Sequence, residues 1–131
     1  MLFRSVRVHR QLILAALKRK LFPAQADVVH AVTELLVDRG ERAAIVNGEM
    51  GCGKTIEALG TVNADAEVKS VLVICPATLR RNWAIEAARW LVRPMKVQVI
   101  AGREPLDPGA DVVIVNYDKL IGKAEIGRAH V

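Results

Sequence analysis

Eight consecutive residues, from position 48 to position 55, have the types and the spacing of a phosphate-binding loop. They read Gly-Glu-Met-Gly-Cys-Gly-Lys-Thr, a glycine followed by four variable positions and then Gly-Lys-Thr. Backbone N–H groups can surround a polyphosphate only where the chain bends tightly and no side chain intrudes, which glycines permit. Lys54 supplies a positive charge for the outer phosphates, and Thr55 supplies a hydroxyl ligand for Mg²⁺. The pattern predicts a nucleotide site formed by Gly48, Glu49, Met50, Gly51, Cys52, Gly53, Lys54 and Thr55.

The flanking residues are those expected of elements that hold such a loop in position. Residues 43–46 (Ala-Ala-Ile-Val) predict a short buried strand directly before the loop, and residues 55–59 predict the helix after it. The phosphates would then lie at a helix N-terminus, where unpaired N–H groups and the helix dipole favour anions. The alternative, a glycine-rich turn that binds no ligand, would not require a strand before the loop or a helix after it.

Further along the chain, apolar runs alternate with helical patterns. Strands are predicted at residues 71–75, 97–100 and 111–116. One helix is predicted from Pro23 to a stop at Gly40, and another follows Thr78, which can serve as its cap. Runs buried on both faces and separated by helices are typical of a parallel sheet in an α/β fold. Because ligands bind at the carboxyl ends of such strands, one edge is predicted to carry three candidate sites: the phosphate loop, residues 76–78 and residues 116–117.

Composition sets the broad class of protein. The 131 residues are 52% hydrophobic, so the chain can fill the core of one domain. The net charge of +5 is compatible with a phosphate-bearing partner or simply with a basic surface. Cys52 and Cys75 lack the spacing of metal ligands, and free thiols suit a reducing cytoplasm. No run reaches the length of a membrane span, so no membrane partner is expected.

Four segments resemble the first RecA-like lobe of a superfamily-two helicase, in particular the Swi/Snf-type ATPases that translocate on double-stranded DNA. In the family's order they are residues 21–25 (Leu-Phe-Pro-Ala-Gln), 48–55, 75–86 (Cys-Pro-Ala-Thr-Leu, then Asn-Trp and Glu) and 111–118 (Asp-Val-Val-Ile-Val-Asn-Tyr-Asp). They resemble motifs Q, I, Ia and Ib. The resemblance implies an α/β fold, a three-layer RecA-like P-loop NTPase lobe with a parallel sheet, here incomplete.

The resemblance also implies roles for single residues. Gln25 would read adenine, and Lys54 would be the catalytic residue of the phosphate loop, with ATP and Mg²⁺ as cofactors. Nucleic acid, most specifically double-stranded DNA, would be contacted by Thr78, Arg80, Arg81 and Tyr117. Simpler interpretations stay open: an exposed helix residue at 25, a helix cap at 78, a solvated face at 80 and 81, and a strand-end cap at 117. Gly48 and Cys52 replace the family's usual Asp and Leu, which indicates a divergent member of bacterial or phage origin.

Two parts of the family's catalytic machinery have no counterpart in this sequence. The acidic motif that holds Mg²⁺ and orients the attacking water is absent after Asn116, and so is the second RecA-like lobe. We therefore expect an ATP-binding fragment of a cytoplasmic DNA-dependent ATPase, inactive without the missing lobe. Its expected parts are a basic segment (1–20), the partial lobe (21–124) and a non-native tail (125–131), because Glu-Ile-Gly-Arg-Ala-His-Val can be encoded by the start of a common sequencing adapter.

In the family's sheet, the strand before the phosphate loop pairs with strands that follow the acidic motif. Residues 43–47 are therefore expected to lack a partner, which leaves an apolar strand with unpaired N–H and C=O groups. We expect a chain that is partly molten or that aggregates.

Two other classes of function fit parts of the sequence. A phosphate-loop kinase or other small-molecule NTPase would need an acceptor pocket and a lid, and no lid-like cluster of arginines follows residues 97–100. A non-catalytic nucleic-acid-binding module would use only the basic surface, so ATP would have no effect and Lys54→Ala would leave DNA binding unchanged. A helicase-like ATPase predicts loss of ATP binding on that substitution.

Overall fold

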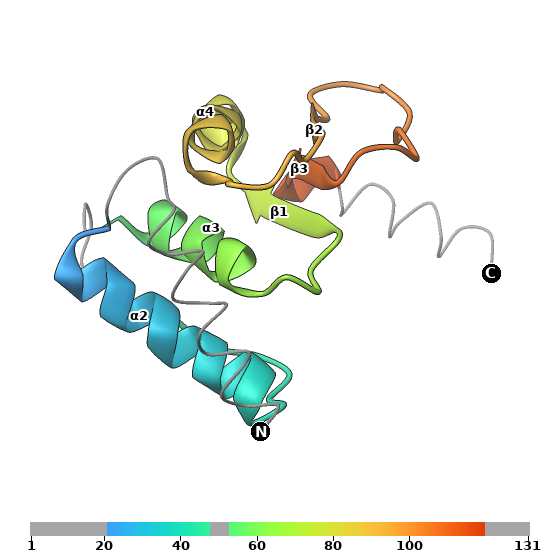
Figure 1. Cartoon of the computed structure of the whole chain (residues 1–131). Helices are drawn as coiled ribbons and strands as arrows, with labels where there is room; N and C mark the ends of the chain where they lie inside the picture. The colour runs from blue at the N-terminus through green and yellow to red at the C-terminus, as the bar shows by residue number, and fades with distance from the viewer. Residues whose placement is uncertain (1–20, 48–52, 120–131) are drawn as a thin grey trace. The chain divides into compact units, whose positions relative to one another are not determined.

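The computed structural model describes residues 21–47 and 53–119, which form two compact units (Figure 1). The first unit contains residues 21–47, 53–68 and 88–94, and the second contains residues 69–87 and 95–119. The predicted basic segment (1–20) and the predicted non-native tail (125–131) lie outside the described residues, and so does most of the phosphate loop, residues 48–52.

The first unit begins with helix α2 (Pro23–Thr33), which continues into a short π-helical segment, η1 (Glu34–Asp38). Pro23 suits the first turn because its missing N–H would have no partner there. The chain turns away at Gly40, whose φ of 68° lies in the left-handed region that glycine adopts without strain. The predicted helix that starts at Pro23 and stops at Gly40 is confirmed.

Helix α3 (Lys54–Ala64) packs closely against α2 (Figure 1). The two helices lie close together at Gly60, where an added Cβ would lie 2.8 Å from Cγ2 of the fully buried Val29. Leu59 and Ala64 are buried as well. The helix predicted after the phosphate loop is confirmed.

Residues 90–93 form hydrogen bonds with the C-terminal end of α3 and the residues after it. The buried Asn63 donates from Nδ2 to the carbonyl of Trp90 (2.8 Å), and its Oδ1 accepts from the N–H of Val92 (3.1 Å). The guanidinium of Arg93 donates to four backbone carbonyls, those of Val62, Asp65, Ala66 and Val68. A helix leaves its last carbonyls without intrahelical partners and favours a positive charge beside them, so Arg93 stabilises this end of α3 in both respects.

The second unit contains a parallel sheet of three strands in the order β1-β3-β2. The strands are β1 (Val71–Cys75), β2 (Val97–Val99) and β3 (Val112–Asn116), which confirms the three strands predicted in this part of the chain. Ile114, in the central strand, pairs with Val73 on one side and with Val99 on the other. The α/β class and the parallel sheet are confirmed.

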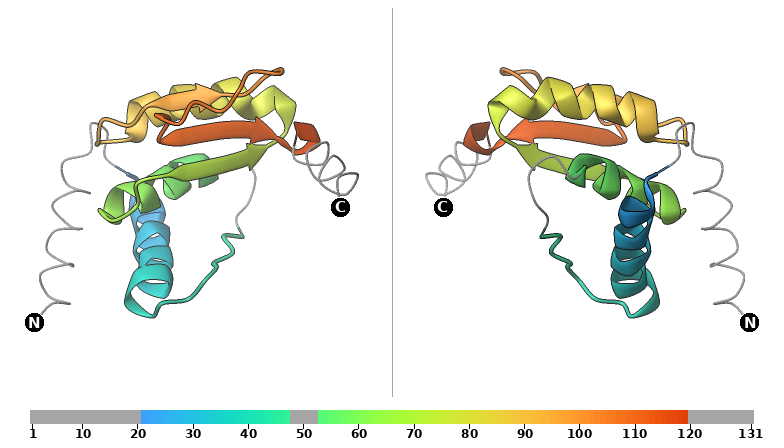
Figure 2. Two further views of the ribbon diagram at one scale, coloured as in Figure 1. Left: turned by 90° about the vertical axis from the view of Figure 1, so that its right-hand side faces the viewer. Right: turned by 90° about the vertical axis from the view of Figure 1, so that its left-hand side faces the viewer.

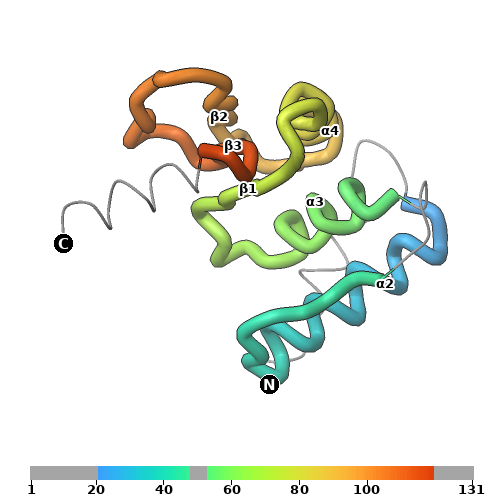
Figure 3. The backbone as a smooth tube through the Cα atoms, turned by 180° about the vertical axis from the view of Figure 1, so that it is seen from behind, coloured from blue at the N-terminus to red at the C-terminus, as the bar shows by residue number. Residues whose placement is uncertain are grey.

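Helix α4 (Arg80–Trp90) connects β1 to β2 and is preceded by a single 3₁₀ turn, η2 (Ala77–Leu79). The chain can be followed from β1 through this turn into α4 in Figure 3. In Figure 2, α4 runs along one face of the sheet. Its buried residues include Ala87, at 2% exposed.

The prediction that the run at 71–75 is buried on both faces is wrong. Val73 and Cys75 are buried, but Leu72 is 58% exposed and Ile74 is 42% exposed. Alternate residues of a strand point to opposite faces, so Val73 and Cys75 lie on the covered face of β1, whereas Leu72 and Ile74 lie on the other face.

The predicted strand at residues 43–46 is also wrong, since residues 43–47 adopt no regular secondary structure and Ile45 is 94% exposed. A strand exists only where a neighbour satisfies its N–H and C=O groups. In the described residues, the three paired strands are β1, β2 and β3, and none pairs with this segment. The described residues before the phosphate loop therefore form no strand, and the prediction that the loop shares one sheet edge with residues 76–78 and 116–117 stays a prediction.

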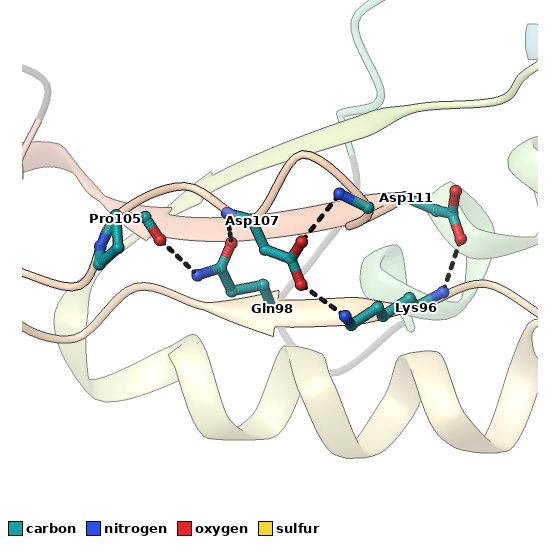
Figure 4. Close-up of polar contacts among 6 residues, drawn as sticks. Lys96, Gln98, Pro105, Asp107 and Asp111 are labelled. Carbon is teal, nitrogen blue, oxygen red and sulfur yellow. Dashed lines mark hydrogen bonds and ion pairs between the residues drawn. The ribbon is translucent and has the colours of Figure 1, made fainter.

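The loop between β2 and β3 is held by polar side chains in and next to β2 (Figure 4). The amide of Gln98 bridges it, because Nε2 donates to the carbonyl of Pro105 (2.9 Å) and Oε1 accepts from the N–H of Asp107 (2.9 Å). The carboxylate of Asp107 also pairs with the ammonium of Lys96, and this contact lowers the pKa of Asp107 and raises the pKa of Lys96. The loop is thus anchored to β2 along its length.

Candidate nucleotide and nucleic-acid sites

The described end of the phosphate loop has the backbone geometry of an anion site. Gly53, directly before α3, has φ 87° and ψ 37°, in the left-handed region. Lys54 is the first residue of the helix and is exposed, and the half-buried Thr55 follows it. The first N–H groups of a helix have no intrahelical acceptor, and together with the dipole they favour an anion. Gly48, Glu49, Met50, Gly51 and Cys52 lie outside the described residues.

Gln25, predicted from another part of the chain, lies against this end of the loop. A Cβ added to Gly53 would collide with Nε2 of Gln25. The Gln25 side chain is only 8% exposed, and its Oε1 accepts from the N–H of Phe22 at 3.1 Å. This bond fixes the amide at the start of α2, with its nitrogen toward Gly53. The interpretation of Gln25 as an ordinary exposed helix residue is wrong, and the structure brings residues 25 and 53 together.

One residue near this site was missed by the sequence analysis. Glu57, in the first turn of α3, is 5% exposed, and its Oε2 has no hydrogen-bond partner in the described part of the chain. A carboxylate in the first turn is favoured by the helix dipole. The available signal was an acidic residue at the fourth position of α3, which is a weak signal because such positions are usually solvated.

The predicted nucleic-acid residues all belong to the second unit. Thr78 lies in η2, Arg81 in the first turn of α4, and Tyr117 directly after β3, and all three are exposed. The prediction that Thr78 caps the next helix is wrong, because α4 begins at Arg80. The turn between them is closed by a backbone bond, from the N–H of Leu79 to the carbonyl of Pro76 (2.9 Å).

Arg80 differs from Arg81 because its N–H groups donate hydrogen bonds to acceptors within the second unit. Nε donates to the carbonyl of Ala77 (3.2 Å), and Nη1 lies within 3.2 Å of Asn116 Oδ1. Nη1 also lies 3.4 Å from the carbonyl oxygens of Ile100 and Ala101. The interpretation of position 80 as a solvated face is therefore wrong.

Cys75 ends β1 close to this cluster and is a buried free thiol. Burial raises the pKa of Cys75, and the charge of Arg80 opposes this effect. Its Sγ lies 3.9 Å from the carbonyl of Val115. Nucleophilic chemistry needs an accessible thiolate, so the surroundings of Cys75 favour a packing role.

The comparison with known proteins identifies the family. A family profile described as "SNF2-related domain" matches residues 24–128, which is most of the chain. The chain belongs to the SNF2-related family. The resemblance to Swi/Snf-type superfamily-two ATPases is thereby confirmed, and the described α/β fold is that of part of a RecA-like lobe.

Individual relatives agree with this family. The "DNA annealing helicase and endonuclease ZRANB3" of Mus musculus is 31% identical over 114 residues, which cover 83% of this chain and 10% of the relative. "Protein CHROMATIN REMODELING 8" of Arabidopsis thaliana is 40% identical over 75 residues, covering 55% of this chain and 6% of the relative. The "SWI/SNF-related matrix-associated actin-dependent regulator of chromatin subfamily A-like protein 1" of Xenopus tropicalis is 33% identical over 107 residues, covering 80% and 11%. The SNF2-related chain thus spans a small part of the length of these relatives.

No metal cluster of three or more His, Cys, Asp or Glu side chains occurs within residues 21–47 and 53–119. In the same residues, every helix is too short or too polar to cross a membrane.

Proposed function

We propose that this SNF2-related chain binds Mg-ATP at the start of α3 and belongs to a DNA-dependent ATPase of the Swi/Snf type. The observation that carries the proposal is the end of the phosphate loop. Gly53 is left-handed at the N-terminus of an 11-residue helix, and Gln25 is buried against it. A positive φ at this glycine directs successive backbone N–H groups to one side, which is what a phosphate group requires.

The residues present fit a bound nucleotide with magnesium. The exposed ammonium of Lys54 would neutralise the outer phosphates, and the hydroxyl of Thr55 would be a ligand of Mg²⁺. Gln25 would recognise adenine through its amide, as the family resemblance implies. When bound, Mg-ATP would supply the phosphoanhydride whose hydrolysis the family uses, and we propose that an acidic motif and a second lobe elsewhere in the protein are needed for that step.

We further propose that the exposed residues of the second unit bind the sugar-phosphate backbone of duplex DNA. Thr78, Arg81 and Tyr117 offer a hydroxyl, a guanidinium and a phenol at the start of α4 and at the end of β3. Contacts of these types position a protein on DNA without reading its sequence.

A thermal-shift titration with Mg-ATP tests the nucleotide site. At about 100 times the dissociation constant, the ligand should add about 2.7 kcal/mol to the free energy of unfolding. Lys54→Ala should abolish the shift, whereas Lys69→Ala, which removes another exposed lysine, should preserve it. If the wild-type chain melts cooperatively and Mg-ATP leaves its midpoint unchanged, the nucleotide proposal is overturned. Duplex binding that ATP and Lys54→Ala do not affect would favour the non-catalytic module.

A further inference from the structure

Arg80 connects three segments that lie far apart in the sequence. Its guanidinium reaches η2 through Ala77, the end of β3 through Asn116, and the residues just after β2 through Ile100 and Ala101. Strands β1, β3 and β2 run parallel, so these segments follow the carboxyl ends of neighbouring strands. One side chain therefore links the residues that follow all three strands.

Two of the four anchors of Arg80 are chain neighbours of a candidate DNA contact. Ala77 precedes Thr78, and Asn116 precedes Tyr117. Asn116 is only 6% exposed, and both ends of its amide have a partner, because Oδ1 accepts from Nη1 of Arg80 and Nδ2 lies 3.5 Å from Oδ2 of Asp118. Fixing these anchors restricts the backbone of the adjacent exposed residues.

We infer that Arg80 is a positioning residue of the DNA-binding edge, while its neighbour Arg81 makes the phosphate contact. The inference rests on the proposed binding of duplex DNA by this unit. Arg81 is exposed, and no hydrogen bond or ion pair joins it to another described residue, so its guanidinium is available to a ligand. The guanidinium of Arg80 instead donates hydrogen bonds to several acceptors that lie in different directions. A lysine ammonium on a flexible stem does not reproduce this geometry.

The two roles differ in how they depend on charge. A phosphate contact depends mainly on positive charge, so lysine replaces arginine with little loss, and neutralisation lowers the salt slope of binding by about 1. A positioning contact depends on the guanidinium shape, so lysine fails although the charge remains. Each arginine therefore needs both a lysine and a glutamine variant.

The experiment measures the binding of a labelled DNA duplex to the 131-residue chain by fluorescence anisotropy over a series of salt concentrations. We expect Arg81→Lys to keep the wild-type salt slope with a smaller loss of affinity than Arg81→Gln, whose salt slope should be lower by about 1. Arg80→Lys should bind about tenfold more weakly than wild type, close to Arg80→Gln, a loss about as large as that of one charged hydrogen bond. The salt slope of Arg80→Lys should stay at the wild-type value.

Two outcomes separate this inference from the proposed function. If wild type binds the duplex and Arg80→Lys matches it, while Arg80→Gln loses affinity and slope, Arg80 is a phosphate ligand and the inference is overturned. If wild type does not bind the duplex at all, the DNA-binding proposal fails, and this inference fails with it.

A second variant guards against loss of folding in the Arg80 series. Asn116→Ala removes one acceptor of Arg80 and leaves every proposed contact residue in place. In a chain whose far-UV and near-UV circular dichroism match wild type, it should weaken duplex binding with an unchanged salt slope. Wild-type affinity in this folded variant would contradict the positioning role, since a purely structural contact affects stability and not the affinity of the folded protein.

Discussion

Gly53 shows how backbone conformation and packing can require the same residue type. Its φ of 87° is strained for any residue with a Cβ, and the space that a Cβ would need is occupied by the amide of Gln25. Gly40 also has a positive φ, of 68°, but an added Cβ there would meet nothing within 4 Å. A side chain at Gly40 would therefore meet backbone strain alone, whereas a side chain at Gly53 would meet both strain and a steric clash.

We expect Gly53→Ala to lower the free energy of unfolding by about 2–4 kcal/mol, because it combines left-handed strain of about 1–2 kcal/mol with a collision against a buried side chain. Gly40→Ala should cost only the strain, about 1–2 kcal/mol. Urea denaturation of both variants measures the difference. Equal losses would mean that Gln25 moves aside without cost and does not constrain the phosphate loop.

Among the elements, α3 matters most, because its first turn forms the candidate nucleotide site. Its other end is held by Asn63 and Arg93, which bind carbonyl and N–H groups around residues 62–68 and 90–92. Helices of this length are marginal alone and depend on packing and end contacts. Contacts at one end of α3 therefore contribute to the order of the N–H groups at the other.

Arg93→Lys should test this dependence. An ammonium cannot reach four carbonyls in the directions that the guanidinium serves, so we expect a loss of about 1–3 kcal/mol in the free energy of unfolding. Arg103→Lys, at an exposed position in the loop after β2, should change it by less than about 0.5 kcal/mol. Chemical denaturation followed by circular dichroism provides the comparison. A neutral Arg93→Lys would show that the end of α3 is stable without these bonds.

At the scale of the whole molecule, exposed apolar side chains predict self-association. Leu72 and Ile74 are exposed on β1, an edge strand of the described sheet, and Ile45 is almost fully exposed. Edge strands with apolar faces pair readily with other chains. That the chain aggregates stays a prediction, and Leu72, Ile74 and Ile45 are the exposed side chains that would mediate the contact.

Leu72→Thr and Ile74→Thr should reduce self-association, because they remove exposed apolar area and place at each position a β-branched residue, which suits a strand. The free energy of unfolding should change by less than about 0.5 kcal/mol. Val73→Thr, at the buried position between them, should instead cost about 1–3 kcal/mol, because it buries a hydroxyl. Sedimentation velocity over a concentration series, with urea denaturation, distinguishes the two effects. If both surface variants associate as wild type does, the contact between chains does not depend on these two side chains of β1.

The sequence by itself determined the elements whose signals are local. Apolar runs predicted strands at 71–75, 97–100 and 111–116, and Pro23, Gly40 and the residues after Thr55 predicted helices that the structure contains. The motif spacing was sufficient for the family. Gly53 and Lys54 could be predicted as parts of a phosphate loop because the geometry of such a loop depends on only a few consecutive residues.

Only the tertiary structure decided which residues face one another. The apolar residues 43–46 read as a strand, but a strand needs a partner, and the described residues provide none. Gln25 against Gly53, and Arg80 against Asn116, join positions 28 and 36 residues apart, and no local pattern encodes such contacts. Hydrogen bonds and burial depend on the neighbours that the fold supplies, and for this reason the sequence predicted the candidate residues but not which of them bind ligands and which hold others in position.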